Sequence, residues 1–248
     1  MGLPLVEDEG AVRWITFDRP SILNACTLED LGVIGDAVRQ VGPEIRAIVL
    51  TGVGERAFSA GMHVETFRDV SPGAGRRIID QVGDCLGAIR LAPIATVAMV
   101  NGYCLGAAFE MALACDVRVA HPEVRFGLPE VRLGIPSVVE AALLPRYVGL
   151  SRAREMILTG GMYTAADLPL GFVNRLVPAD RLRGATEDIL RALTAPTREV
   201  IAAQKALFET WLNSGLAESI ETSKQLFAEV FDLPATRAAI ARYRQPRA

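Results

Sequence analysis

Two glutamates of this sequence have surroundings that suit acid–base chemistry. Glu110 lies in the apolar stretch NGYCLGAAFEMALACD, three residues after Ala107 and so one helical turn from it. Glu130 follows a proline in FGLPEVRLGIP, where Arg132 is almost the only charge nearby. A carboxylic acid in apolar surroundings holds its proton more readily, which suits a general acid or base. Each glutamate alone also fits an ordinary structural role, so the residues predict an acid–base site but no substrate.

The backbone at two glycine turns could stabilise a negatively charged oxygen. A helix is expected to begin near Gly106, and its first amides, including that of the small Ala107, have no partner within the helix. In the loop ERAFSAGMHV, Ala60 and Gly61 could leave the N–H of Met62 free. Two such preorganised donors are what an enolate-like oxygen needs. Simple close packing around the glycines is the alternative.

Other common kinds of site are excluded. The sequence has no dinucleotide-binding, P-loop or G-x-S-x-G motif, and its two histidines, His63 and His121, are too few for a histidine-rich metal site. The four cysteines form no C-x-x-C pair, which predicts reduced thiols in a cytoplasmic protein rather than a metal site or a disulfide framework. They are Cys26, Cys85, Cys104 and Cys115. We therefore expect no metal ion.

Composition indicates a globular protein that binds neither nucleic acid nor a membrane. Half of the 248 residues are apolar and the net charge is −3, so a large core can form and no basic surface for nucleic acid is expected. The apolar stretch 94–115 is long enough to cross a bilayer, but it contains Asn101, two glycines and Glu110. We interpret it as a buried strand, a turn and a buried helix.

Apolar periodicity predicts an α/β fold with right-handed crossovers. Strands are expected at 11–18, 46–51, 94–100, 117–120 and 124–126, with a glycine-containing loop at 57–64. Helices are expected at 27–38, 75–91, 105–115, 140–160, 180–193, 197–213 and 216–230. The strand pattern fades after about residue 140. We place the boundary between an α/β core, 1–185, and a C-terminal helical region, 186–248, near residue 185.

Four segments in order resemble the crotonase superfamily, and most closely its enoyl-CoA hydratases and isomerases. They are RPSILNA at 19–25, AFSAGMHV at 57–64, NGYCLGAAFEMALACD at 101–116 and FGLPEVRLGIP at 126–136. The resemblance covers nearly the whole chain and implies a ClpP/crotonase spiral of β-β-α units. It also implies an acyl-CoA substrate, no separate cofactor, and a homotrimer or homohexamer in which the helical region covers a neighbouring copy.

The resemblance also implies roles for individual residues. The backbone N–H groups of Met62 and Ala107 would form an oxyanion hole for the thioester carbonyl. Glu110 would position and activate water, and Glu130 would exchange a proton at the α-carbon. The residues implied to line the coenzyme A groove are Ile22, Leu23, Ala25, Ala60, Gly61, Met62, His63, Val64, Gly106 and Ala107. Two carboxylates favour hydration of a 2-trans-enoyl-CoA to a 3-hydroxyacyl-CoA.

The sequence departs from the family pattern near this site. His63 replaces a usually acidic residue, and alanines replace glycines after Gly106. Where relatives commonly carry G-x-G-G, this chain has SVVE, so Glu140 adds a third carboxylate, either in the acyl pocket or facing solvent. A delta-3,delta-2-enoyl-CoA isomerase, a crotonase-fold hydrolase or decarboxylase, and an acyl-CoA-binding scaffold without catalysis stay open as alternatives.

Overall fold

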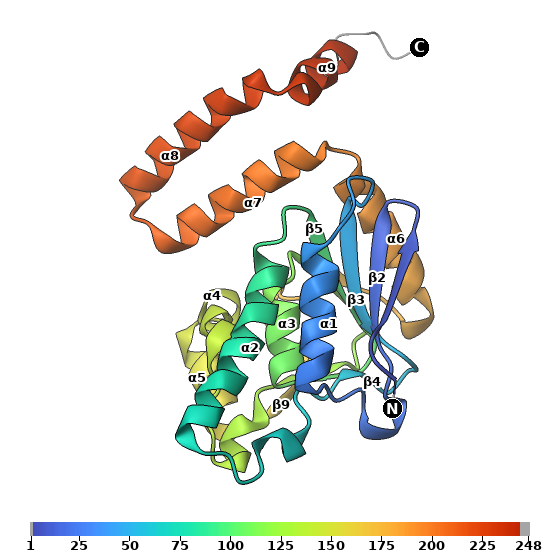
Figure 1. Ribbon diagram of the computed structural model, residues 1–248, viewed down its shortest axis with the longest axis vertical. Coiled ribbons are helices and arrows are strands. Elements are labelled where there is room, and N and C mark those ends of the chain that lie inside the picture. Colours follow the sequence, from blue (N-terminus) through green and yellow to red (C-terminus); the bar gives the residue numbers. More distant parts are fainter. Residues whose placement is uncertain (1, 244–248) are drawn as a thin grey trace.

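The chain winds through two sheets, so that long and short strands alternate along the sequence (Figure 1). A computed structural model describes residues 2–243. The first sheet has the order β1 (Leu5–Glu9), β2 (Val12–Phe17), β3 (Ala47–Gly52), β5 (Ala95–Val100), β7 (Val117–Ala120) and β10 (Arg175–Leu176). The second has the order β4 (Ala57–Ser59), β6 (Tyr103–Leu105), β8 (Arg125–Gly127) and β9 (Met162–Thr164).

Each turn of the spiral gives one strand to each sheet and then returns through a helix. β3 and β4 lead to α2 (Pro72–Arg90), and β5 and β6 lead to α3 (Ala107–Ala114). All pairs within β2–β3–β5–β7–β10 and within β4–β6–β8 are parallel, whereas β1 and β9 add antiparallel edges. These repeating β-β-α units confirm the expected crotonase-like spiral.

The first sheet is covered by helices on both faces. α1 (Leu28–Arg39), α2 and α3 cover one face, where the larger apolar core lies. α6 (Leu182–Thr194) covers the other and buries Leu182 and Leu190 against Trp14 and the strand valines. The boundary proposed near residue 185 falls inside α6. Strands buried on both faces need continuous apolar residues, as β3 shows by being buried along its whole length.

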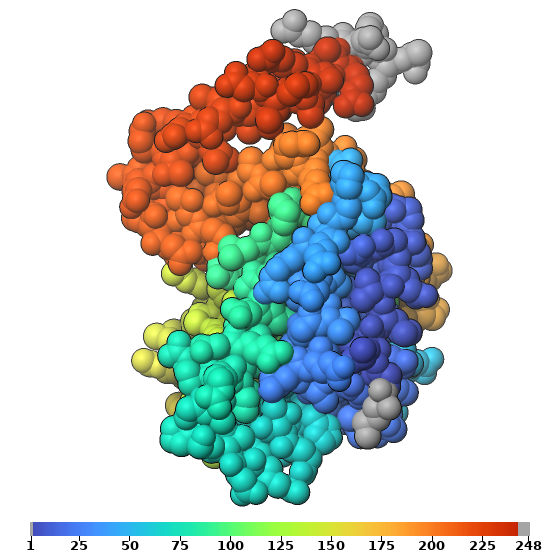
Figure 2. Space-filling model, viewed as in Figure 1, coloured from blue at the N-terminus to red at the C-terminus, as the bar shows by residue number. Residues whose placement is uncertain are grey.

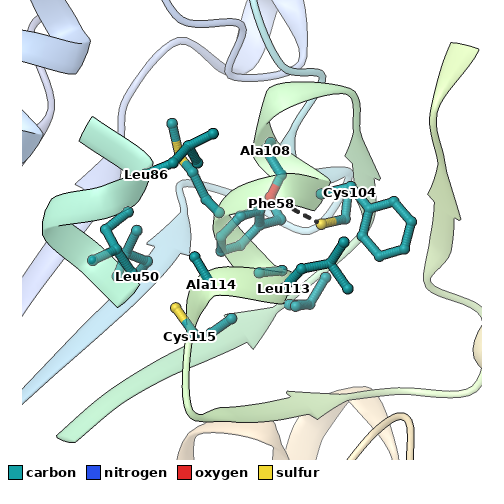
Figure 3. Packing of buried hydrophobic residues seen from close by; sticks show 14 of the residues in the cluster. Leu50, Phe58, Leu86, Cys104, Ala108, Leu113, Ala114 and Cys115 are labelled. Carbon is teal, nitrogen blue, oxygen red and sulfur yellow. Dashed lines mark hydrogen bonds between the residues drawn. The ribbon is translucent and has the colours of Figure 1, made fainter. Parts of the chain in front are cut away.

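Helix α3 is buried on every side, as Figure 3 shows for Ala108, Leu113 and Ala114 among the surrounding apolar side chains. A helix in such a position must be apolar all round, and its small alanines let neighbouring elements approach closely. Glu110 is its one charged residue. The apolar stretch 94–115, which is long enough to cross a bilayer, is divided between β5, β6 and the core helix α3. Within residues 2–243, no helix combines the length and apolar character needed to cross a membrane.

The last three helices extend away from the core (Figures 1 and 2). They are α7 (Arg198–Asn213), α8 (Leu216–Glu229) and α9 (Pro234–Tyr243). Lys205 anchors α7 to the core, because its buried ammonium donates to the Ile94 carbonyl at 3.1 Å and to Asp116 at 2.8 Å. Between α7 and α8 lies an open groove of about 800 Å³, lined by apolar side chains such as Trp211 and Phe227.

Several expected elements differ in the structure. The expected loop 57–64 begins with β4, and the helix expected from residue 105 begins at Ala107, because Tyr103–Leu105 pair as β6. The helix expected over 140–160 is three elements: η4 (Val139–Leu143), α4 (Leu144–Val148) and α5 (Leu150–Thr159). Gly149, at φ 77°, separates the last two because that conformation cannot continue a helix. No element was expected at β1, β9, β10 or α9.

Candidate active site

The second sheet brings three backbone segments to one edge. Because β4, β6 and β8 are parallel neighbours, their carboxyl ends lie side by side. Gly61 and Met62 follow the first strand, Gly106 and Ala107 follow the second, and Glu130 follows the third. Ligands of sheets with parallel strands bind beyond these ends. The topology therefore assembles the residues that were selected from separate sequence motifs.

The backbone at Gly61 passes very close to the start of α3. A Cβ added to Gly61 would lie 2.5 Å from the Leu105 carbonyl oxygen and 3.1 Å from the Ala107 nitrogen, so no side chain fits there. Gly61 also has φ 83°, a conformation that residues with a Cβ rarely adopt. The glycine thus allows the Met62 segment to lie against Ala107.

The directions of the flanking amides are fixed by pairing with Cys26. The Cys26 N–H donates to the Gly61 carbonyl at 2.8 Å, and the His63 N–H donates to the Cys26 carbonyl at 2.7 Å. Alternation along an extended backbone turns the N–H of Met62 to the opposite side, away from Cys26. The N–H of Ala107, at the first position of α3, has no partner within the helix. The arrangement is suited to binding an oxyanion.

Glu110 extends from the first turn of α3 and is 3% exposed. Burial raises the pKa of Glu110 well above its usual range, and the nearby Glu130 and Glu140 carboxylates raise it further. The backbone amides of Ala141 and Glu140 oppose this effect by favouring the ionised form. Within residues 2–243, its buried Oε2 atom has no hydrogen-bond partner. A buried acceptor without a donor destabilises the folded state, unless a ligand or a water molecule donates a hydrogen bond to it.

Glu130 lies on the short 3₁₀ helix η3 (Pro129–Leu133), because Pro129 starts a helical turn. Its Oε1 atom is close to the turn before α3, where a Cβ on Gly106 would lie 2.7 Å from it. The Ser137 hydroxyl donates to Oε2 at 2.8 Å. Burial raises the pKa of Glu130, whereas hydrogen bonds from its own backbone and from Ser137 lower it.

The third carboxylate, Glu140, is buried. Its side chain pairs with Arg90 of α2, with an Nε–Oε1 distance of 3.4 Å, and the same guanidinium also pairs with Glu209 of α7. Burial raises the pKa of Glu140 and the Arg90 charge lowers it. The solvent-facing alternative for Glu140 is therefore wrong. The charge of Glu140 raises the pKa of Glu110, whereas its backbone amide lowers it.

The loop expected to line a coenzyme A groove is held in an unusual conformation. Leu23 and Asn24 both have left-handed backbones, with φ values of 54° and 56°. The buried Asn24 side chain donates to the carbonyls of Val53 and Ala57 and accepts from the Arg19 amide. The Ala60 amide donates to the Leu23 carbonyl at 2.9 Å, which joins this loop to the segment before Gly61. Ile22 and Ala25 belong to the same loop, and Ala25 is buried.

Two further expected residues lie beyond Met62 on the same segment. His63 is half-buried and precedes the 3₁₀ helix η2 (Val64–Phe67), while Val64 is exposed. The His63 backbone bonds to Cys26, and no hydrogen bond of its imidazole is seen within residues 2–243. Its position beside Met62 agrees with a place at the rim of the site.

The sequence reasoning missed three polar residues that support the site. Ser59 accepts a hydrogen bond from the Gly61 amide at 3.1 Å, Asn24 fixes the first loop, and Ser137 bonds to Glu130. Asn24 could have been recognised as a polar residue inside an otherwise apolar motif. The contact of Ser137 had no sequence signal, because it depends on the direction of the loop after η3.

Nucleophilic or metal chemistry has little support around these residues. The four cysteines are buried and unpaired, and burial raises the pKa of Cys26, Cys85 and Cys115 to about 12. A thiol with such a pKa is a poor nucleophile at neutral pH. Residues 2–243 contain no group of three or more histidine, cysteine or acidic side chains placed to hold a metal ion. The arrangement can instead hold an oxyanion and move protons between carboxylates.

Comparison with known proteins gives matches over nearly the whole chain. The enoyl-CoA hydratase/isomerase family profile matches residues 7–247. A short-chain-enoyl-CoA hydratase of Clostridium acetobutylicum is 27% identical, covering 98% of this chain and 95% of its own. A probable enoyl-CoA hydratase of Mycobacterium tuberculosis is 33% identical, with the same coverages of 98% and 95%. The solved enoyl-CoA hydratase of Mycobacterium smegmatis is 28% identical, covers 100% of this chain and 99% of its own, and superposes with a TM-score of 0.91. The chain belongs to the enoyl-CoA hydratase/isomerase family and has the crotonase fold.

Proposed function

We propose that this protein hydrates a 2-trans-enoyl-CoA to a 3-hydroxyacyl-CoA, using Glu110 and Glu130 as its acid–base pair. The observation that carries the proposal is the meeting of both carboxylates with the backbone of Met62 and Ala107 at the ends of β4, β6 and β8. Family membership supplies the substrate class, since named relatives are enoyl-CoA hydratases. Coenzyme A enters as part of the substrate, and the proposed reaction needs no metal ion or separate cofactor.

The amides of Met62 and Ala107 act on the thioester carbonyl. When water adds to the β-carbon, the electron pair of the double bond moves toward the carbonyl oxygen and forms an enolate. Both N–H groups favour the negative charge on that oxygen, and the start of α3 adds its helix dipole. Because the amides are fixed before reaction, little reorganisation is needed. Donors of this kind contribute on the order of a hundred- to thousand-fold each to the rate.

The two glutamates have different parts in the proton transfers. Glu110, as the carboxylate, holds the attacking water and takes its proton while the oxygen bonds to the β-carbon. Glu130, as the acid, gives its proton to the α-carbon. Burial raises the pKa values of both groups toward neutral pH, and a general acid or base is most effective when its pKa is close to the working pH. The pair must then exchange one proton to return to its starting state.

The position of Glu140 favours this pair over a mechanism with a third carboxylate. Its side chain pairs with Arg90 of α2, which offsets its charge. Isomerisation of a 3-enoyl-CoA would need a single carboxylate that carries a proton between carbons. Two glutamates beside one oxyanion site are more than that reaction requires, and they suit the addition of water.

An enoyl-CoA panel tests the proposal through loss of the conjugated-thioester absorbance. We expect wild-type protein to hydrate at least one enoyl-CoA, and both Glu110→Gln and Glu130→Gln to lose on the order of a hundred-fold or more in kcat, as removal of a general acid or base does. Arg68→Gln, which breaks only an exposed ion pair with Glu65, is the control. Binding of coenzyme A esters without hydration would contradict the proposal and favour an acyl-CoA-binding scaffold. Retained isomerase activity in Glu110→Gln would favour a one-carboxylate mechanism.

We also propose that α7–α9 cover a neighbouring copy in a trimer or a pair of trimers. The exposed apolar side chains on these helices support this, among them Trp211, Leu216, Ile220 and Phe227, which line the groove between α7 and α8. Large exposed apolar surfaces of this kind mark interaction sites. Light scattering after size-exclusion chromatography should give three or six copies, and Phe227→Glu should reduce that number. A monomeric wild type would contradict the assembly without affecting the proposed reaction.

A further inference from the structure

The chain after Glu130 reverses direction and returns to it. η3 ends at Gly134, whose φ of 77° forms a left-handed cap, and the Ile135 amide donates back to the Glu130 carbonyl at 3.3 Å. This reversal brings Ser137, seven residues later, to the carboxylate, where its hydroxyl donates to Oε2 at 2.8 Å. Both side chains are half-buried. A 3₁₀ helix of five residues provides little else to fix the long Glu130 side chain.

The two oxygens of Glu130 therefore have different surroundings. Oε2 is occupied by the Ser137 hydroxyl, whereas Oε1 lies 2.7 Å from the position that a Cβ on Gly106 would take, one residue before Ala107. When Glu130 is protonated and Ser137 donates to Oε2, the acidic proton is carried by Oε1. That is the oxygen beside the oxyanion site, where an α-carbon next to the bound carbonyl would lie.

We propose that Ser137 is a positioning residue, which holds Oε2 of Glu130 so that Oε1 carries the proton to and from the α-carbon. This inference rests on the proposed hydration by Glu110 and Glu130 and adds a residue that controls one of them. The hydroxyl keeps the carboxyl group from rotating away, so the proton stays within reach of the substrate. Positioning of this kind accounts for large rate factors in enzymes, because small misplacements are costly.

Few charges compete with Ser137 for control of Glu130. Glu110 faces it from α3, and Glu140 of η4 is paired with Arg90. On η3 itself, Arg132 turns toward the Thr159 carbonyl at 3.4 Å. On α5, which packs against η3, Arg152 and Glu155 pair with each other. The Ser137 hydroxyl is thus the side chain whose removal should act most directly on proton transfer by Glu130.

The test compares Ser137→Ala and Ser137→Thr with wild type in the hydration of the best enoyl-CoA. We expect Ser137→Ala to lower kcat about ten- to a hundred-fold with little change in KM, the factor that matches loss of a hydrogen bond to a charged group. Without the hydroxyl the pKa of Glu130 should rise, so the alkaline limb of the pH–rate profile moves to higher pH. Ser137→Thr retains a hydroxyl and should therefore keep both the kcat and the pH–rate profile of the wild type. Thr194→Val is the control, because it removes a hydroxyl that donates to the Leu190 carbonyl at 2.8 Å on α6, which lies on the opposite face of the first sheet. It should change neither kcat nor the pH–rate profile.

Glu130→Gln is measured in parallel to separate the two ideas. If it loses hydration while Ser137→Ala matches Thr194→Val in kcat and pH profile, the positioning role is wrong and the proposed function stands. If Ser137→Ala loses activity together with thermal stability and its pH profile is unmoved, the hydroxyl is merely structural and the inference is also overturned. If Glu130→Gln retains full hydration, the proposed function itself fails.

Discussion

The contact between Gly61 and the start of α3 allows a sharp test of the oxyanion site. In Gly61→Ala the new Cβ would meet the Leu105 carbonyl at 2.5 Å and the Ala107 nitrogen at 3.1 Å, and both are backbone atoms that cannot rotate away. The Met62 and Ala107 segments must then separate. Gly54→Ala is a matched control, because Gly54 has nearly the same φ, 80° against 83°, and nothing within 4 Å of its added Cβ.

Both substitutions strain a left-handed backbone, but only Gly61→Ala also crowds its neighbours. Placing alanine in a left-handed backbone costs roughly 1–2 kcal/mol of unfolding free energy in either variant. Gly61→Ala adds about 1–3 kcal/mol, typical of overpacking in a dense interior. Displacement of an oxyanion donor should lower kcat by about a hundred- to a thousand-fold. Gly54→Ala should lose stability only and keep kcat within about two-fold, since among residues 2–243 nothing crowds its added Cβ.

Chemical denaturation and the enoyl-CoA hydration assay measure both quantities on the same samples. The prediction is that stability falls in both variants while kcat falls only in Gly61→Ala. Should Gly61→Ala retain the kcat of Gly54→Ala, the close approach of the two amides would have no part in catalysis. Equal loss of kcat in both variants would mean that general destabilisation, not the geometry of the amides, lowers activity.

Two further predictions concern buried charges. Lys205→Met should cost about 3 kcal/mol of unfolding free energy, because it leaves the Asp116 carboxylate without its buried cation. The control Lys224→Met breaks an exposed ion pair with Glu221 and should cost under about 1 kcal/mol. Chemical denaturation of both variants measures these costs, and equal costs would contradict the anchoring role of Lys205. The raised pKa of Glu110 means that its favourable contribution to stability is fully present below the unfolded carboxyl pKa of about 4.5 and is lost as pH rises through the folded value. Relative to Glu110→Gln, wild type should therefore become less stable as pH rises from about 4.5 toward neutral, and a constant difference across that range would show that Glu110 is not perturbed.

The sequence indicated the residues that meet at the candidate site better than it indicated the strands that position them. Glu110 and Ala107 could be paired because helical spacing is fixed, whatever surrounds the helix. The three-residue strands β4 and β6 are too short for an alternating pattern and were hidden in segments interpreted as a loop and a turn, whereas β8 was expected as a strand at 124–126. Yet their parallel pairing is what brings the motifs together. The resemblance to a family supplied the juxtaposition that periodicity could not.

Side-chain direction was the second limit. Glu140 could not be assigned from the sequence because its partner, Arg90, is 50 residues away, and Glu209, which shares that guanidinium, is 119 residues from Arg90. Ser137 entered the sequence analysis only as part of the SVVE segment that stands where relatives commonly carry G-x-G-G. Its hydrogen bond depends on the left-handed cap at Gly134, which reverses the loop. Long-range ion pairs and loop reversals are set by the assembled fold and not by local propensity.

Val139 has a backbone conformation that suits glycine better than valine. It has φ 44°, a left-handed conformation that is unfavourable for a β-branched residue, and its side chain packs against the core beside Gly83 of α2. Any valine codon becomes a glycine codon through a single change at its second base. Glycine would adopt this backbone without strain and would remove a branched side chain from the segment that precedes Glu140. One point mutation at Val139 can therefore remove a core-packed side chain next to Glu140, and the backbone already has the conformation that the smaller residue prefers.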